Sequence, residues 1–213
     1  MDCYFDVRFK TLFYLHPPAE LTSGIRDDHI RPLKEACERH DVPFRNISGS
    51  LSEFMRQLEH MPKEHKLLIV DDLQTAVTDS SKWADIFQRV SHHIFLSIIL
   101  INQNYFSGKY GPDIRRNCTD FVLFRTLREK NYISNIAADL LKGNARFLEK
   151  CFSWVGENVE NSYDRYIVID RNEGSDPNLP RHHLQYFGVK TNLFKDPKTG
   201  MRLVVYFPCS SLR

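Results

Sequence analysis

The segment KLLIVDDL, at Lys66–Leu73, constrains the fold of this chain more than any other part of its sequence. Four consecutive apolar residues suit a strand that is buried on both faces, as in parallel sheets covered by helices. The strand ends in two adjacent carboxylates, Asp71 and Asp72. Ligands of open α/β sheets bind in the crevice outside the carboxyl ends of the strands. The segment therefore predicts a parallel sheet with an acidic site at its edge.

Apolar strand patterns alternate with amphipathic helix patterns along the 213 residues. Strands are expected at Thr11–Leu15, Leu67–Val70, Phe95–Ile101, Phe121–Phe124, Tyr166–Ile169 and Leu203–Phe207, with a weak strand or an extended connector at Val42–Ile47. Helices are expected at Ile30–His40, around Phe54–Leu58, and at Asp79–Val90, Asn131–Leu141 and Ala145–Trp154. This alternation predicts a three-layer α/β fold with a mostly parallel sheet flanked by helices. We expect a single α/β domain over residues 1–213, with a core at about 9–194 and an edge strand in 195–213.

The composition excludes several classes of protein. A hydrophobic fraction of 42% and a charged fraction of 26% are ordinary for a soluble globular chain, and a net charge of +2 excludes a polybasic nucleic-acid binder. The five cysteines form no CxxC pair, which indicates reduced thiols rather than disulfides or a zinc site. No apolar run approaches the ~20 residues that cross a bilayer. We expect a soluble, intracellular protein of the cytoplasm or nucleus.

A second apolar strand pattern, Phe95–Ile101, ends in Asn102-Gln103-Asn104. Adjacent parallel strands lie about 4.8 Å apart, so polar residues at their carboxyl ends can converge on one ligand. One carboxylate can hold Mg²⁺ while its neighbour polarises a water molecule, and an amide can hydrogen-bond a phosphate. This is the arrangement of a Walker B motif with a sensor residue. An Asp-Asp pair after a strand is also common as a helix N-cap with a solvated neighbour, but the polar end of the next strand favours the site.

The sequence resembles the FtsK/HerA class of P-loop ATPases through KLLIVDDL, SHHIFLSIILINQN (Ser91–Asn104) and NCTDFVLFR (Asn117–Arg125). More narrowly, it is similar to the genome-packaging ATPases of large DNA viruses and of the virus-like Polinton (Maverick) transposons. The similarity runs from about Phe9 to Phe194 and includes YDRYIVID and LQYFGVKTNLF. It implies a RecA-like ASCE P-loop NTPase core, with ATP and Mg²⁺ as cofactors of the intact family. It also implies a homo-oligomeric ring that translocates double-stranded DNA without reading its sequence, and no membrane association.

The resemblance assigns roles by position. Asp71 matches the acid that orients Mg²⁺, Asp72 the catalytic acid, and Gln103 the glutamine that ends the sensor strand and contacts the nucleotide. Asp72 is shorter than the glutamate that is common at its position, so its reach to the attacking water is reduced.

An arginine finger acts in trans in cellular relatives, just before the sensor strand. His92 occupies that place here, and Arg89 lies one helical turn earlier. Arg89 is therefore the candidate finger, with Arg115 and Arg116 as alternatives. Each of these arginines can equally be a surface cation or a phosphate contact.

The phosphate-binding loop GxxxxGK[ST] of such ATPases is missing from the sequence. The glycines before Asp71 are Gly24 and Gly49, and neither precedes a lysine, while Gly108-Lys109 follows the sensor strand. In this class the P-loop strand lies between the sensor strand and the strand that corresponds to Phe121–Phe124. The sequence thus predicts a fragment or degenerate copy of a DNA-packaging ATPase, which hydrolyses ATP poorly or not at all by itself. The alternative is a catalytically inactive α/β interaction or DNA-associated protein derived from that fold.

Overall fold

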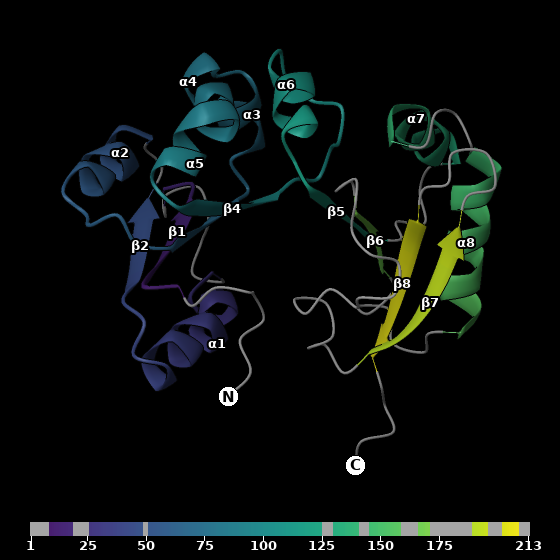
Figure 1. The fold of residues 1–213 in the computed structure, drawn as a ribbon, viewed down its shortest axis with the longest axis horizontal. Coiled ribbons are helices and arrows are strands. Elements are labelled where there is room, and N and C mark those ends of the chain that lie inside the picture. Colours follow the sequence, from purple (N-terminus) through teal and green to yellow (C-terminus); the bar gives the residue numbers. More distant parts are fainter. Residues whose placement is uncertain are drawn as a thin grey trace. The chain divides into compact units, whose positions relative to one another are not determined.

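Two compact units make up the computed structural model (Figure 1). The structure describes residues 9–18, 26–48, 51–124, 130–140, 145–158, 166–170, 189–195 and 202–208. One unit spans Val7–Asn117, and the other contains the described residues from Cys118 onward. The sequence interpretation had placed one domain over 1–213. Gly24 and Gly49 lie outside the described residues.

The Val7–Asn117 unit is built on a four-stranded parallel sheet in the order β2-β1-β3-β4. Its strands are β1 (Thr11–His16), β2 (Phe44–Ser48), β3 (Lys66–Asp71) and β4 (Leu96–Ile101). The expected α/β fold with a parallel sheet is confirmed in this unit. In β3, Leu67, Leu68 and Val70 are buried, as the apolar run predicts.

Helices connect the strands of this unit. They are α1 (Arg26–Arg39), α2 (Leu51–Glu59), α3 (Gln74–Thr78), α4 (Ser81–Asp85), the π-helical turn η2 (Ile86–Val90), α5 (Ser91–His93) and α6 (Gly111–Arg116). The single helix expected at Asp79–Val90 instead begins at Ser81 and continues from Ile86 as a π-helical turn, a local change of winding that apolar periodicity does not encode. Ser80 is the N-cap residue of α4, and its hydroxyl accepts a hydrogen bond from the Trp83 backbone N–H at 3.4 Å. Within the described part of the chain, no helix combines the length and apolarity that a membrane crossing requires.

The two faces of the parallel sheet are covered by different helices (Figure 1). On one face α1 packs its Ile30 and Cys37 against Leu12, Tyr14 and Leu67. On the other face Phe13 of β1 meets Phe54 of α2 edge-on at 5.4 Å between ring centroids, and Phe54 stacks on Trp83 of α4 at 6.1 Å. The strand order explains this. α1 connects β1 outward to β2, whereas α2 returns to β3, and right-handed crossovers in opposite directions put helices on opposite faces.

The second unit differs from the sequence prediction, because its sheet is antiparallel. Its strands β5 (Asp120–Phe124), β6 (Tyr166–Asp170), β7 (Val189–Lys195) and β8 (Arg202–Pro208) lie in the order β5-β6-β8-β7, and its helices are α7 (Lys130–Leu140) and α8 (Ala145–Asn158).

Two predicted strands of this unit were placed wrongly. Phe121–Phe124 was expected in the parallel sheet, but it pairs antiparallel with β6 in a separate sheet, because a short apolar run does not encode the direction of its neighbour. Leu203–Phe207 was expected at an edge, yet β8 lies between β6 and β7. The polar segment Val189–Lys195 gave no strong strand pattern and forms the edge instead.

Candidate functional site at the carboxyl edge of β3 and β4

Asp71 and Gln103 lie beyond the same edge of the parallel sheet. β3 and β4 pair directly and in parallel, with Asp71 in register with Ile101, the last residue of β4. Gln103 follows two residues later and is exposed. The expected pairing of the two strands is therefore confirmed, and Asp71 and Gln103 lie at the carboxyl ends of these strands, where α/β sheets commonly bind ligands.

The Asp71 carboxylate is half-buried and is held by a tyrosine of the neighbouring strand. The hydroxyl of Tyr14 donates a hydrogen bond to Asp71 Oδ2. Tyr14 is buried in β1, where it is in register with Ile69 of β3. Sequence reasoning missed this partner. Its signal was a tyrosine within an apolar strand, because a buried tyrosine hydroxyl usually takes a hydrogen-bond partner.

Asp72 turns the chain out of the sheet. Its backbone has a φ of 58°, a left-handed conformation that aspartate tolerates better than most residues, and its side chain is exposed. The N-cap position of α3 is Leu73, whose side chain makes no cap hydrogen bond. The N-cap residue of α3 is therefore neither Asp71 nor Asp72.

Gln74, the first residue of α3, fixes the segment that follows β4. Its Oε1 accepts hydrogen bonds from the backbone N–H groups of Gln103 and Asn104, at 3.1 Å and 2.9 Å. These two N–H groups are consequently satisfied within the protein. Gln74 had not been singled out in the sequence, although its position three residues after Asp71 places it at this edge.

Helix α3 and the residue after it, Asp79, also hold the later part of the loop that follows β4. Tyr110 donates its backbone N–H to the carbonyl of Thr78 at 2.7 Å, and Lys109 donates its own to Asp79 Oδ1 at 2.8 Å. Gly108 has a φ of +80°, and a Cβ there would come within 2.0 Å of Thr78 Oγ1. Only glycine fits this close approach, so the glycine of the Gly108-Lys109 pair serves packing.

Arg89, the candidate finger, is on the surface of the unit. Its side chain is 74% exposed, and its Nη2 lies 2.5 Å from Asp85 Oδ1, one helical turn away. Exposed pairs at this spacing contribute about 0.3–0.5 kcal/mol, so little free energy holds Arg89 in this pose.

The two alternative arginines differ from each other. Arg116 is exposed and pairs with Asp113 at 3.3 Å. Arg115 donates from Nη1 to the carbonyl of Tyr105 at 2.8 Å and places its guanidinium 4.7 Å from the centre of that ring. The Arg115 side chain therefore stabilises the loop after β4.

Lys66 is buried in the parallel sheet, at the edge opposite to Asp71 and Asp72. Lys66 begins β3, and its Nζ donates to the carbonyls of Pro62, Glu64 and Ile94 at 2.6, 2.9 and 3.4 Å. Burial lowers the pKa of Lys66 from its ordinary value of 10.5. Its role is structural, since the amino edge of β3 is remote from the crevice at the carboxyl edge.

Among the residues that the structure describes, no three His, Cys, Asp or Glu side chains gather in a group suited to a metal ion. Mg²⁺ does not need such a cage, because it is commonly held by one or two carboxylates together with substrate phosphates. The oxygen donors of Asp71, Asp72 and Gln103 suit this hard cation.

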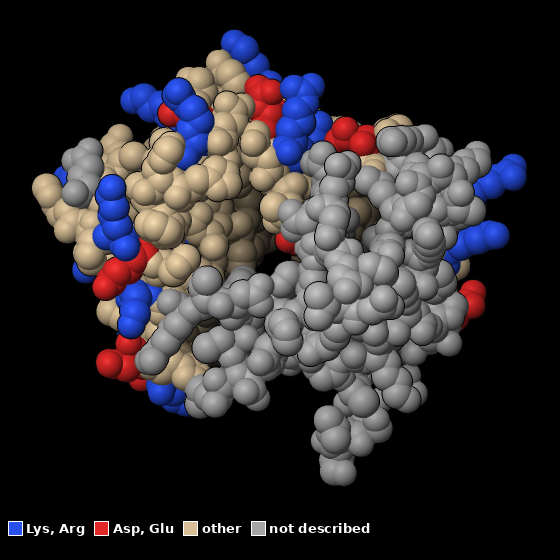
Figure 2. All heavy atoms as spheres, viewed as in Figure 1, with Lys and Arg blue, Asp and Glu red and all other residues tan. Residues whose placement is uncertain are grey.

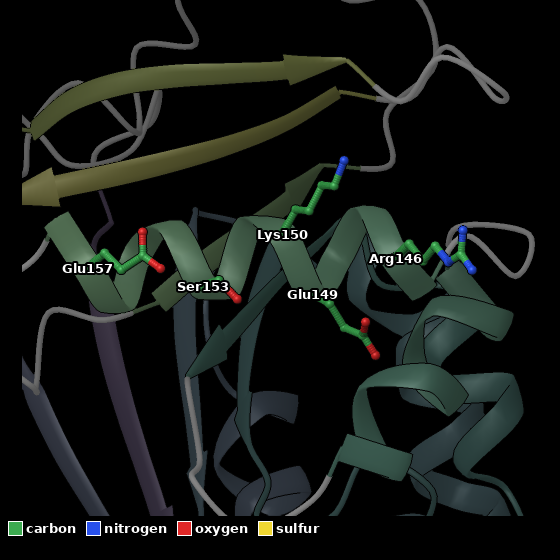
Figure 3. A pocket seen from close by; sticks show the side chains of 5 residues that line it. All are labelled: Arg146, Glu149, Lys150, Ser153 and Glu157. Atoms are coloured by element: carbon green, nitrogen blue, oxygen red, sulfur yellow. The ribbon is translucent and has the colours of Figure 1, made fainter.

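A shallow hollow in the second unit does not resemble a nucleotide site. Its lining comes from one exposed side of α8 alone (Figure 3): Arg146, Glu149, Lys150, Ser153 and Glu157. Residues at this helical spacing with alternating charge form a solvated helix surface.

Comparison of the chain with protein-family models, with curated proteins and with solved structures finds no match.

Proposed function

We propose that the Val7–Asn117 unit carries the acidic half of an ATP-hydrolysing site of the FtsK/HerA class. The chain would be a fragment or degenerate copy of a viral or transposon DNA-packaging ATPase with a RecA-like ancestry. The observation that carries this proposal is the pairing of β3 with β4, which leaves Asp71 and Gln103 at one carboxyl edge. The resemblance in sequence supplies the chemistry expected at that edge.

Each residue has a proposed role. Asp71 would hold Mg²⁺ through water, and Tyr14 fixes its carboxylate through Oδ2. Asp72 would polarise the attacking water by accepting a proton from it. The Gln103 amide would donate a hydrogen bond to the terminal phosphate. Mg²⁺, when bound, neutralises charge on the phosphates.

Arg89 is the best candidate for a residue that acts on a neighbouring subunit. It is exposed and pairs with Asp85, whereas Arg115 is engaged by the loop after β4. In a ring, Arg89 could therefore exchange Asp85 for a phosphate of the next subunit at small cost.

The chain lacks a means of binding the phosphates of ATP. The sequence has no GxxxxGK[ST] loop, and Gln74 already occupies the N–H groups of Gln103 and Asn104. Phosphate cradles are built from backbone N–H groups that point at the ligand. We therefore expect no more than weak ATP hydrolysis from this polypeptide.

ATP turnover and nucleotide binding by the full chain test this proposal. The expected result is no turnover above the rate of the Asp72→Asn variant. Asparagine also tolerates the left-handed conformation of this position, so the variant keeps the fold while removing the carboxylate. Clear turnover that disappears in Asp72→Asn would show a complete site and contradict an inactive chain.

The alternative is a catalytically inactive α/β interaction or DNA-associated protein derived from that fold. The hydrogen bond from Tyr14 to Asp71 also fits this alternative, because it joins β1 to β3 and so contributes to the fold. Among the described residues on the face shown in Figure 2, Lys and Arg side chains are interspersed with Asp and Glu. Gel shifts with long duplex DNA across a salt series separate a DNA-associated chain from one with an interaction role alone. Salt-sensitive binding supports a translocase origin, and no binding argues against any DNA role.

A further inference from the structure

The two oxygens of the Asp71 carboxylate are in different surroundings. Oδ2 accepts a hydrogen bond from the Tyr14 hydroxyl. Tyr14 is in register with Ile69, and Asp71 lies two residues further along β3, so both side chains belong to one face of the sheet. Among the described residues, no donor reaches the second oxygen, Oδ1. Oδ1 is therefore the oxygen through which this carboxylate can meet a ligand.

The ring of Tyr14 is held on several sides by the core. Tyr14 is 6% exposed and packs with Ile30 and Cys37 of α1. Its ring stacks on Phe44 of β2 at 6.5 Å between centroids and lies 5.6 Å from the ring of His16. A ligand that approached Oδ2 would have to break the hydrogen bond of a buried donor that has little room to turn, and such a loss is unfavourable.

Mg²⁺ and Ca²⁺ differ in what they need from such a carboxylate. Mg²⁺ gives up its water reluctantly and usually keeps several water molecules when one or two carboxylates hold it. A water molecule of hydrated Mg²⁺ needs a single acceptor oxygen, which Oδ1 supplies. Ca²⁺ takes roughly six to eight oxygen ligands and often uses both oxygens of one carboxylate. With Oδ2 engaged by Tyr14, Asp71 offers Ca²⁺ one oxygen only.

We infer that Tyr14 makes the carboxyl edge of β3 selective for Mg²⁺ over Ca²⁺, because it keeps Oδ2 of Asp71 from chelating a cation. This role rests on the proposed function, since it requires a divalent cation at Asp71. Asp72 and Gln103 are exposed, so their side chains are less restricted than that of Asp71 and discriminate less between the two ions. Tyr14 is thus a residue that determines specificity without being a ligand.

A purely structural role of Tyr14 predicts a different behaviour. If the hydroxyl only orients Asp71, its removal weakens the binding of both cations alike, because residues that support a ligand contribute to metal affinity in general. If the hydroxyl blocks chelation, its removal gives Ca²⁺ a second oxygen and changes the ratio of the two affinities. The ratio, rather than either affinity, therefore separates the two roles.

Competition against Mn²⁺ in the full chain, followed by NMR, measures this ratio. Mn²⁺ broadens the amide signals near its site, and Mg²⁺ or Ca²⁺ is added until the signals of Asp71 and Gln103 recover. We expect Ca²⁺ to compete no better than Mg²⁺ with the wild-type chain. In Tyr14→Phe, Ca²⁺ should gain about tenfold relative to Mg²⁺, within the ~10–100-fold by which supporting residues change metal affinity. The dispersion of the same spectra shows whether the variant is folded.

Tyr110→Phe is the matched control, because it removes a tyrosine hydroxyl at the N-cap position of α6 instead of at Asp71. It should leave the ratio of the two affinities unchanged.

Two results would overturn the role of Tyr14 alone. They are a ratio that is unchanged in folded Tyr14→Phe, and a wild-type chain for which Ca²⁺ competes better than Mg²⁺. Both would leave a cation bound at this edge. Absence of Mn²⁺ broadening at Asp71 in the wild-type chain would instead contradict the proposed function, and the role of Tyr14 together with it.

Discussion

The hydrogen bond from Tyr14 to Asp71 joins β1 to the acidic end of β3, and its free energy can be measured directly. Tyr14→Phe removes the hydroxyl and keeps the ring that packs in the core. Hydrogen bonds to charged groups contribute about 1.5–3 kcal/mol, and the half-buried carboxylate regains water when the partner is lost, so we expect a cost of about 1–2 kcal/mol.

A double-mutant cycle with Asp71→Ala isolates this interaction from the other effects of each substitution. Urea unfolding of the four proteins, followed by fluorescence and circular dichroism, should give a coupling free energy of about 1–2 kcal/mol. Leu68→Ala in place of Asp71→Ala is a control for general weakening of β3, because Leu68 is in register with Phe13 and lies on the face of the sheet opposite to Tyr14. A coupling indistinguishable from zero would refute the assignment of Tyr14 as the residue that fixes Asp71.

Three further predictions concern packing and thiol chemistry. Phe54→Ala should lower the free energy of unfolding by about 3–5 kcal/mol, because Phe54 is fully buried, whereas Phe106→Ala should cost about 1 kcal/mol or less; equal losses in urea unfolding would contradict this core. Gly108→Ala should cost about 2 kcal/mol or more, since its Cβ would overlap Thr78, and an unchanged melting curve would refute the close approach. Burial raises the pKa of Cys151 to about 12, so iodoacetamide should label it at pH 8 only after urea is added. Rapid labelling of Cys151 in the native protein, detected by peptide mass spectrometry, would show that the fold around α8 does not protect this thiol.

The sequence was most informative where burial alone determines structure. The run Leu67–Val70 identified β3, and the alternation of patterns identified a parallel sheet with helices on both faces. Phe95–Ile101 was expected to be equally buried, but β4 is an edge strand whose exposed isoleucines look the same in sequence as core residues. Position within a sheet depends on the neighbours of a strand, which a local pattern does not contain.

The candidate site was predicted by position but not by its supporting contacts. Asp71, Asp72 and Gln103 were expected at the carboxyl edge of the sheet. β3, which carries Asp71, and β4, which leads to Gln103, pair with each other there. Tyr14 and Gln74, which hold this edge together, come from separate elements and depend on the fold for their proximity.

The central claim, that the carboxyl edge of β3 and β4 is a divalent-cation site, is tested most directly by Mn²⁺ titration of the full chain followed by NMR. Mn²⁺ serves as a paramagnetic substitute for Mg²⁺, since carboxylate oxygens bind both ions. We predict that line broadening centres on Asp71, Asp72 and Gln103 and is lost in Asp71→Asn. Broadening that spares this edge, or that Asp71→Asn leaves unchanged, would contradict the account.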